Sequence, residues 1–257
     1  MASAGKPGNG GDLSGLRAVV TGGAGGIGEA CARQLASQGA KVTVADINGE
    51  AAGRVADDIG GAFWQVDLSD TAALDDLDLD TDILVNNAGI QRIAAIGDFD
   101  PAAFRLIQRL MLEAPFLLIR AVLPGMYARG YGRIINISSI HGLRASAFKS
   151  AYVSAKHGLE GLSKVAALEG GPHGVTSNCI CPAYVRTPLV EAQIQDQARI
   201  HGITEEEVLS SVLLTEPAVK RLVEPAEVAS LAGWLAGADA GMVTAASYTM
   251  DGGWSGR

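Results

Sequence analysis

The chain has 257 residues, 48% of them hydrophobic and 19% charged, so it can bury the core of a large globular domain and is not a disordered protein. A formal net charge of −8 without any basic stripe excludes a typical nucleic-acid-binding protein. Residues 1–12 contain one Lys and no apolar run, and we therefore expect a flexible tail rather than a signal peptide or membrane anchor.

Two further features predict a cytoplasmic protein with no membrane span and no metal site. The longest apolar stretch, residues 114–127, is too short to cross a bilayer and contains Arg120. The cysteines Cys31, Cys179 and Cys181 lack the spacing of metal ligands, and we interpret them as small buried thiols in a reducing compartment.

Short apolar runs alternate with longer amphipathic stretches from one end of the chain to the other. The apolar runs predict strands at residues 17–21, 41–45, 62–66, 82–85, 133–137, 175–180 and 245–249. The amphipathic stretches predict helices at residues 27–37, 49–59, 101–127, 151–169 and 224–235. This alternation is typical of a single-domain, Rossmann-type α/β fold, in which helices cover both faces of a doubly wound parallel sheet.

Residues 13–257 then form one domain with a single insertion. The polar, helical pattern at residues 187–222 comes before the last predicted helix and strand. An insertion there would lie over the carboxyl ends of the strands, where ligands bind in sheets of this kind. We expect it to act as a helical lid over the substrate.

A glycine-rich run follows the first predicted strand directly. It reads Thr-Gly-Gly-Ala-Gly-Gly-Ile-Gly over residues 21–28 and leads into a helix. Glycines let the backbone turn tightly and approach a pyrophosphate, whose charge is stabilised by the amides of the helix N-terminus. The run therefore predicts a dinucleotide cofactor that contacts Gly22, Gly26, Ile27 and Gly28.

The ends of the next strands extend the predicted nucleotide site. Asp46 ends the second strand, where a carboxylate accepts hydrogen bonds from the ribose hydroxyls of NAD and repels the extra phosphate of NADP. Ile47 follows and offers that phosphate no cation, so we predict NAD as the cofactor. The third and fourth strands end in further candidate cofactor contacts, namely Asp67 and Leu68 near the adenine, and then Asn87, Ala88 and Gly89.

A serine, a tyrosine and a lysine form the candidate catalytic set. Ser139 follows the fifth strand, while Tyr152 and Lys156 stand at positions i and i+4 of the next helix and share a face. A nearby ammonium lowers the pKa of a tyrosine, which can then exchange a proton with a substrate hydroxyl. Ser139 would bind the same oxygen as it becomes a carbonyl. The rival interpretation is a hydrolase that uses Ser139 and His141, but the G-x-S-x-G turn and a placed acid are missing.

Together these motifs establish a family resemblance. The glycine-rich run, Asn-Asn-Ala-Gly at 86–89, the catalytic set and Cys-Pro-Ala-Tyr-Val-Arg-Thr at 181–187 resemble the classical short-chain dehydrogenase/reductase family over residues 13–257. More narrowly, residues 87–91, 134–152, 186–193 and 251–254 are similar to the bacterial D-3-hydroxybutyrate dehydrogenases. The resemblance implies NAD-dependent oxidation of (R)-3-hydroxybutyrate to acetoacetate, and the reverse reduction, by a homotetramer built through its long helices.

The resemblance also implies further site residues. Pro182, Val185 and Thr187 would join Tyr152 and Lys156 in contacting the cofactor. The substrate would lie against Ser139 and Tyr152, and its carboxylate would be bound by Gln91, His141, Lys149 and Gln193, with Trp254 closing the pocket. Taken singly, these residues are equally well explained as a turn histidine, a solvated lysine, surface amides and a packed tail residue.

One position departs from the family pattern. Most members carry an asparagine in the helix after the fourth strand, where it holds a water in a proton relay beside the lysine. This chain has Met111 there, whose thioether cannot donate a hydrogen bond and accepts one poorly. Either another group replaces the relay, or catalysis is slowed, or the helix is locally rearranged. Ala183, where the family has glycine, is a milder change.

Three functions remain open at the level of the sequence. The first is a working 3-hydroxybutyrate dehydrogenase. The second is a related dehydrogenase that acts on another small hydroxy acid or alcohol. The third is a nucleotide-binding regulatory or scaffold protein that has lost catalysis, although such a protein would have no need to keep Ser139, Tyr152 and Lys156.

Overall fold

The computed structural model describes residues 11–256, without the side chains of residues 189, 192, 193, 196, 197, 200 and 201. The predicted tail at 1–12 therefore lies almost entirely outside the described residues. Seven parallel strands form one sheet in the order β3-β2-β1-β4-β5-β6-β7. Their bounds are β1 (Arg17–Thr21), β2 (Lys41–Asp46), β3 (Ala62–Gln65), β4 (Ile83–Asn86), β5 (Gly132–Ile137), β6 (Val175–Pro182) and β7 (Ser247–Met250).

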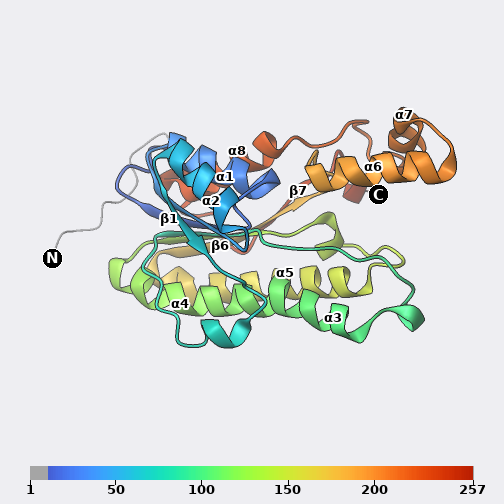
Figure 1. Ribbon diagram of the computed structural model, residues 1–257. Coiled ribbons are helices and arrows are strands. Elements are labelled where there is room, and N and C mark those ends of the chain that lie inside the picture. The colour runs from blue at the N-terminus through green and yellow to red at the C-terminus, as the bar shows by residue number, and fades with distance from the viewer. Residues whose placement is uncertain (1–10, 257) are drawn as a thin grey trace.

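Helices cover both faces of this sheet (Figure 1). One face carries α1 (Gly26–Ser37), α2 (Gly49–Ile59) and α8 (Pro225–Ala236), and the other carries α3 (Pro101–Gln108), α4 (Ala114–Arg129) and α5 (Ser150–Gly170). Every residue of β4, β5 and β6 is buried, which explains why apolar residues in these strands do not alternate with exposed polar ones. Their polar side chains are buried too, and Asn86 donates to Asn136 across the β4–β5 pair. The predicted doubly wound, Rossmann-type parallel fold is confirmed.

The sheet reverses its winding direction at β1, and this reversal positions the site. β1 pairs with β2 on one side and with β4 on the other, so the chain builds the sheet outward in both directions from this strand. Ligands of such sheets bind at the carboxyl ends of the strands where the reversal occurs. The glycine-rich loop after β1 and the Asn-Ala-Gly segment after β4 meet at this point.

The helix predicted over residues 101–127 is not uniform. Between α3 and α4 the segment Arg109–Glu113 is a π-helix. Pro115 has no amide hydrogen to donate to the carbonyl of Met111, four residues earlier, so an α-helical bond is impossible at this point. The wider π turn pairs each carbonyl with the residue five positions on, and such turns occur frequently at functional sites.

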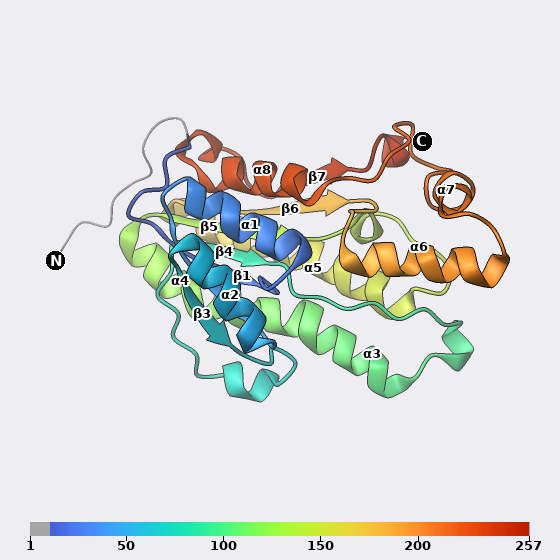
Figure 2. The ribbon, with the colours of Figure 1, turned by 45° about the horizontal axis from the view of Figure 1, so that its top comes forward.

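The insertion predicted at 187–222 is helical and lies beyond the carboxyl ends of β6 and β7 (Figure 2). It contains α6 (Pro188–His201), α7 (Glu205–Val208) and a π-helical turn at Leu209–Leu213. A bridge between Val185 and Val223 joins the two ends of the insertion. It also has a small core of its own, formed by Ile194, Val208, Leu213, Leu214 and Leu222. It is therefore a packed unit, tied to the rest of the domain at this bridge and at Gly252, whose carbonyl accepts from the amides of Ala218 and Val219.

Residues 11–256 were expected to lack a membrane span and a metal site. No helix there is both long and apolar enough to cross a membrane. Within the same residues, no group of three or more His, Cys, Asp and Glu side chains could hold a metal ion. Cys31, Cys179 and Cys181 are free thiols and buried, as the sequence predicts.

Candidate active site

The loop after β1 takes its shape from positions where only glycine fits. Gly22 has a φ of +60°, and a Cβ there would come within 2.9 Å of the Cα of Ala88. A Cβ on Gly28 would lie 2.1 Å from the carbonyl oxygen of Gly22. The loop can therefore pack directly against the first turn of α1, and the free amides of such a turn are suited to a pyrophosphate.

Asn87 fastens this loop to the end of β4. Its Nδ2 donates to the carbonyl oxygens of Thr21 at 3.0 Å and of Gly22 at 3.1 Å. Its backbone amide donates to Thr21 Oγ1 at 2.9 Å. Asn87 thus shapes the glycine-rich loop, in addition to lining the pocket beside it.

Asp46, at the end of β2, faces the same pocket. Its carboxylate accepts hydrogen bonds from the amides of Ala24 at 3.1 Å and Asn48 at 3.0 Å. The side chain of Ile47 is 64% exposed and brings no cation to this edge. This carboxylate is well placed to accept from the hydroxyls of a ribose and would repel a phosphate on it.

An adjoining cavity of about 430 Å³ contains the predicted adenine contacts. Asp46, Asp67 and Leu68 line it, together with apolar side chains of which Ile90 and Leu106 are examples. The Asp67 carboxylate accepts from the hydroxyl of Ser69 at 2.7 Å and from its amide at 2.9 Å, which lowers the pKa of Asp67. Apolar walls suit a flat adenine ring, and the Asp67 carboxylate could accept from its amino group.

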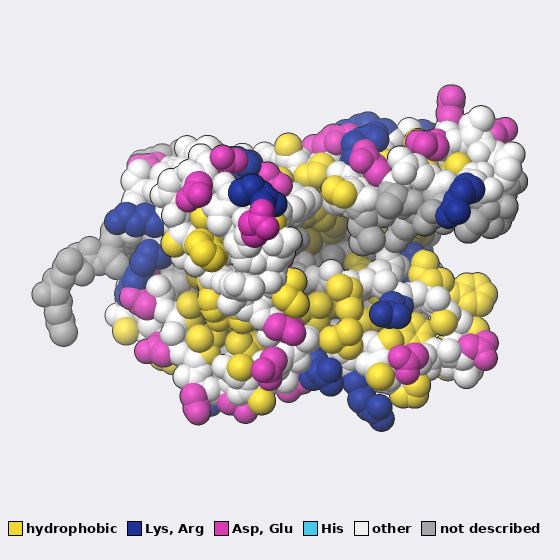
Figure 3. Space-filling model, viewed as in Figure 1, with side chains coloured by type: hydrophobic (Ala, Val, Ile, Leu, Met, Phe, Trp, Pro, Cys, Tyr) yellow, Lys and Arg dark blue, Asp and Glu magenta, His cyan; other side chains and the backbone are white. Residues whose placement is uncertain are grey.

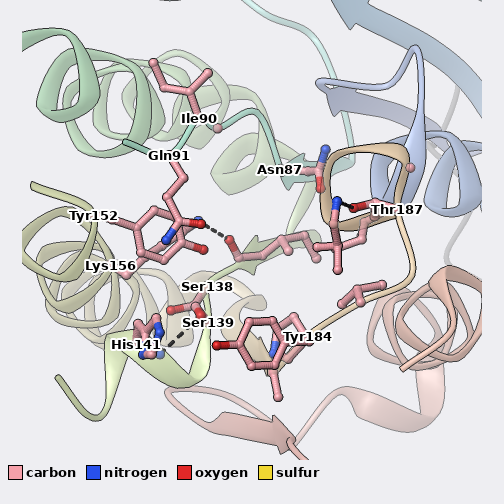
Figure 4. Close-up of a pocket in the computed structure, with 18 of the residues that line it drawn as sticks. Asn87, Ile90, Gln91, Ser138, Ser139, His141, Tyr152, Lys156, Tyr184 and Thr187 are labelled. Carbon is pink, nitrogen blue, oxygen red and sulfur yellow. Dashed lines mark hydrogen bonds between the residues drawn. The ribbon is translucent and has the colours of Figure 1, made fainter. Parts of the chain in front are cut away.

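Tyr152 and Lys156 lie on the buried face of α5, next to the end of β5. Lys156 Nζ donates to the carbonyl of Ile137 at 2.6 Å and lies 5.7 Å from the centre of the Tyr152 ring. The Tyr152 side chain is hydrogen-bonded to Ser139, whose Oγ also accepts from the amide of His141 at 3.1 Å. Figure 4 shows these side chains on one side of the pocket, with Asn87 and Thr187 opposite.

Burial dominates the acid–base properties of this pair. It raises the pKa of Tyr152, and the hydrogen bond with Ser139 opposes the rise. It lowers the pKa of Lys156 to about 8, against the opposing effects of Cys179, Cys181 and Glu160. The pKa of Tyr152 is therefore raised in this structure, not lowered as the sequence predicts, because desolvation of the buried phenol is the largest effect on it.

A second charged group faces the pocket at the start of α5. Lys149 Nζ lies 2.9 Å from His141 Nε2. An ammonium can only donate, so Nε2 accepts and the ring hydrogen belongs to Nδ1. Burial, and then the charges of Lys149 and His157, lower the pKa of His141 to about 4, which keeps the ring neutral. Its buried Nδ1 has no hydrogen-bond partner among the described residues and remains a free donor.

Aromatic side chains form a wall around this lysine. The ring of Tyr184 lies 5.7 Å from Lys149 Nζ and stacks on Trp254 with 6.1 Å between centroids. The Trp254 ring meets His141 edge-on at 5.8 Å. The sequence predicted Trp254 as a site residue but not Tyr184. Tyr184 is nevertheless the aromatic residue within the Cys-Pro-Ala-Tyr-Val-Arg-Thr run at 181–187.

Most of the predicted site residues line one cavity of about 590 Å³, open where the surface is hollowed between the region of α6 and α7 and that of α3 (Figure 3). They are Gly22, Gly26, Ile27, Asp46, Asn87, Ala88, Gly89, Gln91, Ser139, His141, Lys149, Tyr152, Lys156, Pro182, Val185, Thr187 and Trp254. Gly28 packs behind the loop, and Asp67 and Leu68 line the adjoining cavity. The Gln193 side chain lies outside the described residues. The insertion adds Val190, Val212 and Leu213, which no local sequence signal distinguishes from core residues.

Met111 lies within the π-helical turn and is 2% exposed. It lines both the large cavity and a small one of about 10 Å³, which also touches Lys156 and Asn86. The buried Oδ1 of Asn86 has no hydrogen-bond partner among the described residues. Met111 thus lies where this helix departs from α-helical geometry, beside the buried Lys156.

Known proteins share this architecture and these motifs. The family model described as short chain dehydrogenase matches residues 17–198. The chain is 46% identical, over 93% of its own length and 98% of the relative, to the D-beta-hydroxybutyrate dehydrogenase of Rhizobium meliloti. It is 42% identical, over 94% and 98% of the two chains, to the enzyme of the same name from Cupriavidus necator.

A solved structure described as a putative 2-deoxy-D-gluconate 3-dehydrogenase from Agrobacterium tumefaciens with bound NADP is similar over 97% of this chain and 100% of that one. The two superpose with a TM-score of 0.85 at 31% identity. The sheet, the glycine-rich loop and the serine, tyrosine and lysine at one pocket agree with these matches. The chain belongs to the short-chain dehydrogenase family.

Proposed function

We propose that the protein is an NAD-dependent 3-hydroxybutyrate dehydrogenase that oxidises (R)-3-hydroxybutyrate to acetoacetate and catalyses the reverse reduction. The observation that carries this proposal is the position of Lys149. Its half-buried ammonium, paired with neutral His141, lines the same cavity as Ser139, Tyr152 and Lys156. A pocket with one such cation and a proton-transferring tyrosine suits a short hydroxy acid better than a neutral alcohol.

The cofactor would be held across the switch point of the sheet. The loop at 21–28 would bind the pyrophosphate, Asp46 the adenosine ribose, and the cavity at Asp67 and Leu68 the adenine. Tyr152 and Lys156 would contact the nicotinamide half, together with Pro182, Val185 and Thr187. When bound, NAD supplies the acceptor for the hydride that leaves the alcohol carbon. Asp46 favours NAD here, although the similar structure from Agrobacterium tumefaciens contains NADP.

The chain's own residues handle the proton. In oxidation, Tyr152 as phenolate would take the proton of the substrate hydroxyl, while Ser139 donates to the same oxygen as it becomes a carbonyl. The ammonium of Lys156 would stabilise that phenolate from the adjacent turn of α5. In reduction the same tyrosine, protonated, would return the proton.

The other end of the substrate would determine selectivity. The carboxylate would accept hydrogen bonds from the Lys149 ammonium and from the amide of Gln91, and His141 would contribute by holding Lys149 in place at its Nε2. Trp254 and Tyr184 leave room for a short chain only, because they stack across this side of the cavity. With the carboxylate and the hydroxyl both fixed, only one enantiomer presents its carbinol hydrogen to the nicotinamide, and we propose that it is the R alcohol.

The insertion at 187–222 is proposed to be the lid of this site. Its apolar residues Val190, Val212 and Leu213 line the cavity, and its own small core would allow its helical part to move as a unit. Closure would exclude water from the site. The expected contact of Gln193 with the carboxylate belongs to this proposal.

We also propose that the enzyme works in the cytoplasm as a homotetramer. Leu168 of α5 is 76% exposed and Phe116 of α4 is 48% exposed. Phe116 also lines a groove of about 350 Å³ together with Leu112 and Leu162. Burying this apolar face against a second copy would remove it from water. Sedimentation of the purified protein at the mass of a monomer would contradict the tetramer.

Steady-state assays of NADH and NADPH formation test the proposed function. The panel comprises (R)- and (S)-3-hydroxybutyrate, lactate and cyclohexanol, each with NAD and with NADP. We expect the highest kcat/KM for (R)-3-hydroxybutyrate with NAD. A higher kcat/KM for lactate or cyclohexanol would make the protein a different dehydrogenase of the family. An absence of turnover with every pair would favour a nucleotide-binding regulator.

A further inference from the structure

A buried carboxylate lies on the catalytic face of α5 outside the proposed catalytic set. Glu160 follows Tyr152 and Lys156 at the same four-residue spacing, and it is 4% exposed. Its Oε2 accepts from the hydroxyl of Ser247 at 2.5 Å, and its Oε1 accepts from the thiol of Cys181 at 3.1 Å. Buried glutamates are rare in proteins unless a partner stabilises them. The burial of Glu160 therefore indicates a specific role for its carboxylate.

The two hydrogen bonds connect three elements beneath the catalytic residues. Ser247 belongs to β7, and Cys181 belongs to β6 directly before Pro182, a predicted cofactor contact. Gly142, just after the turn that contains Ser139, packs so closely that a Cβ there would lie 3.1 Å from Glu160 Cγ. The carboxylate is thus fixed in place between α5, β6, β7 and the turn that carries Ser139.

Glu160 is also the acidic side chain that can balance the charge of Lys156. The titratable groups that act on Lys156 are Cys179 and Cys181 of β6 and Glu160 of its own helix. Burial raises the pKa of Cys179 to about 12 and that of Cys181 further, so both stay neutral thiols at working pH. The large cavity itself adds Tyr152, the neutral ring of His141, the ammonium of Lys149, Tyr184 and, at its far end, Asp46.

We propose that Glu160 is a positioning residue that acts through Lys156: its buried carboxylate keeps the neighbouring ammonium protonated and holds the catalytic face of α5 against β6 and β7. This inference rests on the proposed function, in which the ammonium stabilises the Tyr152 phenolate. A lysine that is fully buried loses its proton readily, since desolvation penalises the charged form. A negative charge held one helical turn away opposes that loss.

The effect of Glu160 on the pKa of Lys156 has a definite direction, which the pH dependence of the reaction can test. Burial lowers the pKa of Lys156 to about 8, and Glu160 acts to raise it. Removing the carboxylate should lower that pKa further, so that the ammonium is lost at a lower pH. The alkaline limb of kcat/KM for alcohol oxidation should then move to lower pH in Glu160→Gln, by about one pH unit.

The experiment compares pH profiles of kcat/KM for four proteins: the unmodified enzyme, Glu160→Gln, Glu160→Asp and Ser163→Ala. Glu160→Asp keeps the charge, so its alkaline limb should stay near that of the unmodified enzyme even if kcat falls. Ser163→Ala removes a buried hydrogen bond to Ser177 from the same helix without changing any charge, and it controls for loss of stability. An unshifted alkaline limb in Glu160→Gln would overturn the proposal, as would an equal shift in Ser163→Ala.

A double variant, and a chemical measurement on Lys156 that needs no turnover, test the role of Glu160 independently of the pH profiles. If Glu160→Gln does not fold, the double variant Glu160→Leu with Ser247→Ala removes the charge and its polar partner together, and the same shift is expected. Reductive methylation of the Lys156 amine, followed against pH by peptide mass spectrometry, needs no turnover. If the unmodified enzyme oxidises no alcohol, the proposed function fails, while the methylation profiles still decide the role of Glu160. Identical profiles with and without the carboxylate would refute it.

Discussion

The cofactor end and the substrate end of the pocket are built in different ways. At the cofactor end, backbone and short side chains at the ends of β1, β2 and β4 form a cradle around Gly22 and Asp46, and the register of the sheet sets its shape. At the substrate end, His141, Lys149 and Trp254 come from a turn, from the start of α5 and from the C-terminal segment, respectively. The first arrangement suits a cofactor that many enzymes share, whereas the second can vary without disturbing the sheet.

The boundary between the two ends is the proton-transferring pair, and the largest effect is expected there. Tyr152→Phe removes the hydroxyl that exchanges the proton and leaves the ring in place. We expect kcat to fall by about 10²- to 10⁴-fold, with NADH binding largely unchanged. Steady-state rates and NADH fluorescence titration measure the two quantities. A variant that keeps more than about a tenth of the normal kcat would assign proton transfer to another group.

The next effect belongs to the substrate end alone. Lys149→Ala removes the formal positive charge beside His141, and we expect it to raise KM for (R)-3-hydroxybutyrate by an amount equivalent to about 1.5–3 kcal/mol. KM for NAD, and for any neutral alcohol that the enzyme accepts, should stay unchanged. Steady-state kinetics with the acid and with a neutral alcohol give the two KM values to be compared. A KM for the acid within about twofold of normal would show that the carboxylate binds elsewhere.

A substitution at the cofactor end should have a smaller effect, on the preference for NAD and not on the binding of the substrate. The unmodified enzyme should prefer NAD to NADP by at least about tenfold in kcat/KM, which corresponds to about 1.4 kcal/mol. Asp46→Ala should reduce that preference, chiefly by weakening NAD, because the ribose hydroxyls lose their acceptor. Equal kcat/KM values for NAD and NADP in the unmodified enzyme would contradict the role assigned to Asp46.

The smallest effect is expected at Met111, which borders the substrate pocket and the small cavity beside Lys156. If proton release through this region is slow, Met111→Asn should raise kcat with little change in KM for NAD. The amide would lie near Asn86, whose buried Oδ1 has no partner among the described residues. A kcat that is unchanged or lower would mean that the π-helical arrangement already serves proton release, or that the site is packed for a thioether.

These two ends also differ in how well the sequence predicts them. The cradle could be predicted because its signals are local: a glycine run after a strand, and an acid where the next strand ends. The parallel sheet follows from the same alternation of strands and helices. Lys149 and His141 were identified only through a resemblance, since neither has a local pattern that distinguishes it from a surface residue.

What the sequence did not indicate depends on contacts between distant segments. Tyr184 becomes part of the site by stacking on Trp254, and Leu213 by the packing of the insertion. The π-helical turn at Arg109–Glu113 follows from Pro115, a cue present in the sequence but hidden inside a strongly helical stretch. The pKa of Tyr152 was predicted in the wrong direction, because the burial of the phenol depends on the whole fold.

The central claim is that the substrate end recognises a carboxylate, and one ratio tests it most directly. Steady-state kinetics with NAD should compare (R)-3-hydroxybutyrate with (R)-butan-2-ol, which has the same hydroxyl and chain but no carboxylate. We expect kcat/KM for the acid to exceed that for the alcohol by at least about tenfold, the least that a charge-assisted hydrogen bond to Lys149 should contribute. Equal kcat/KM values for the two compounds would contradict it.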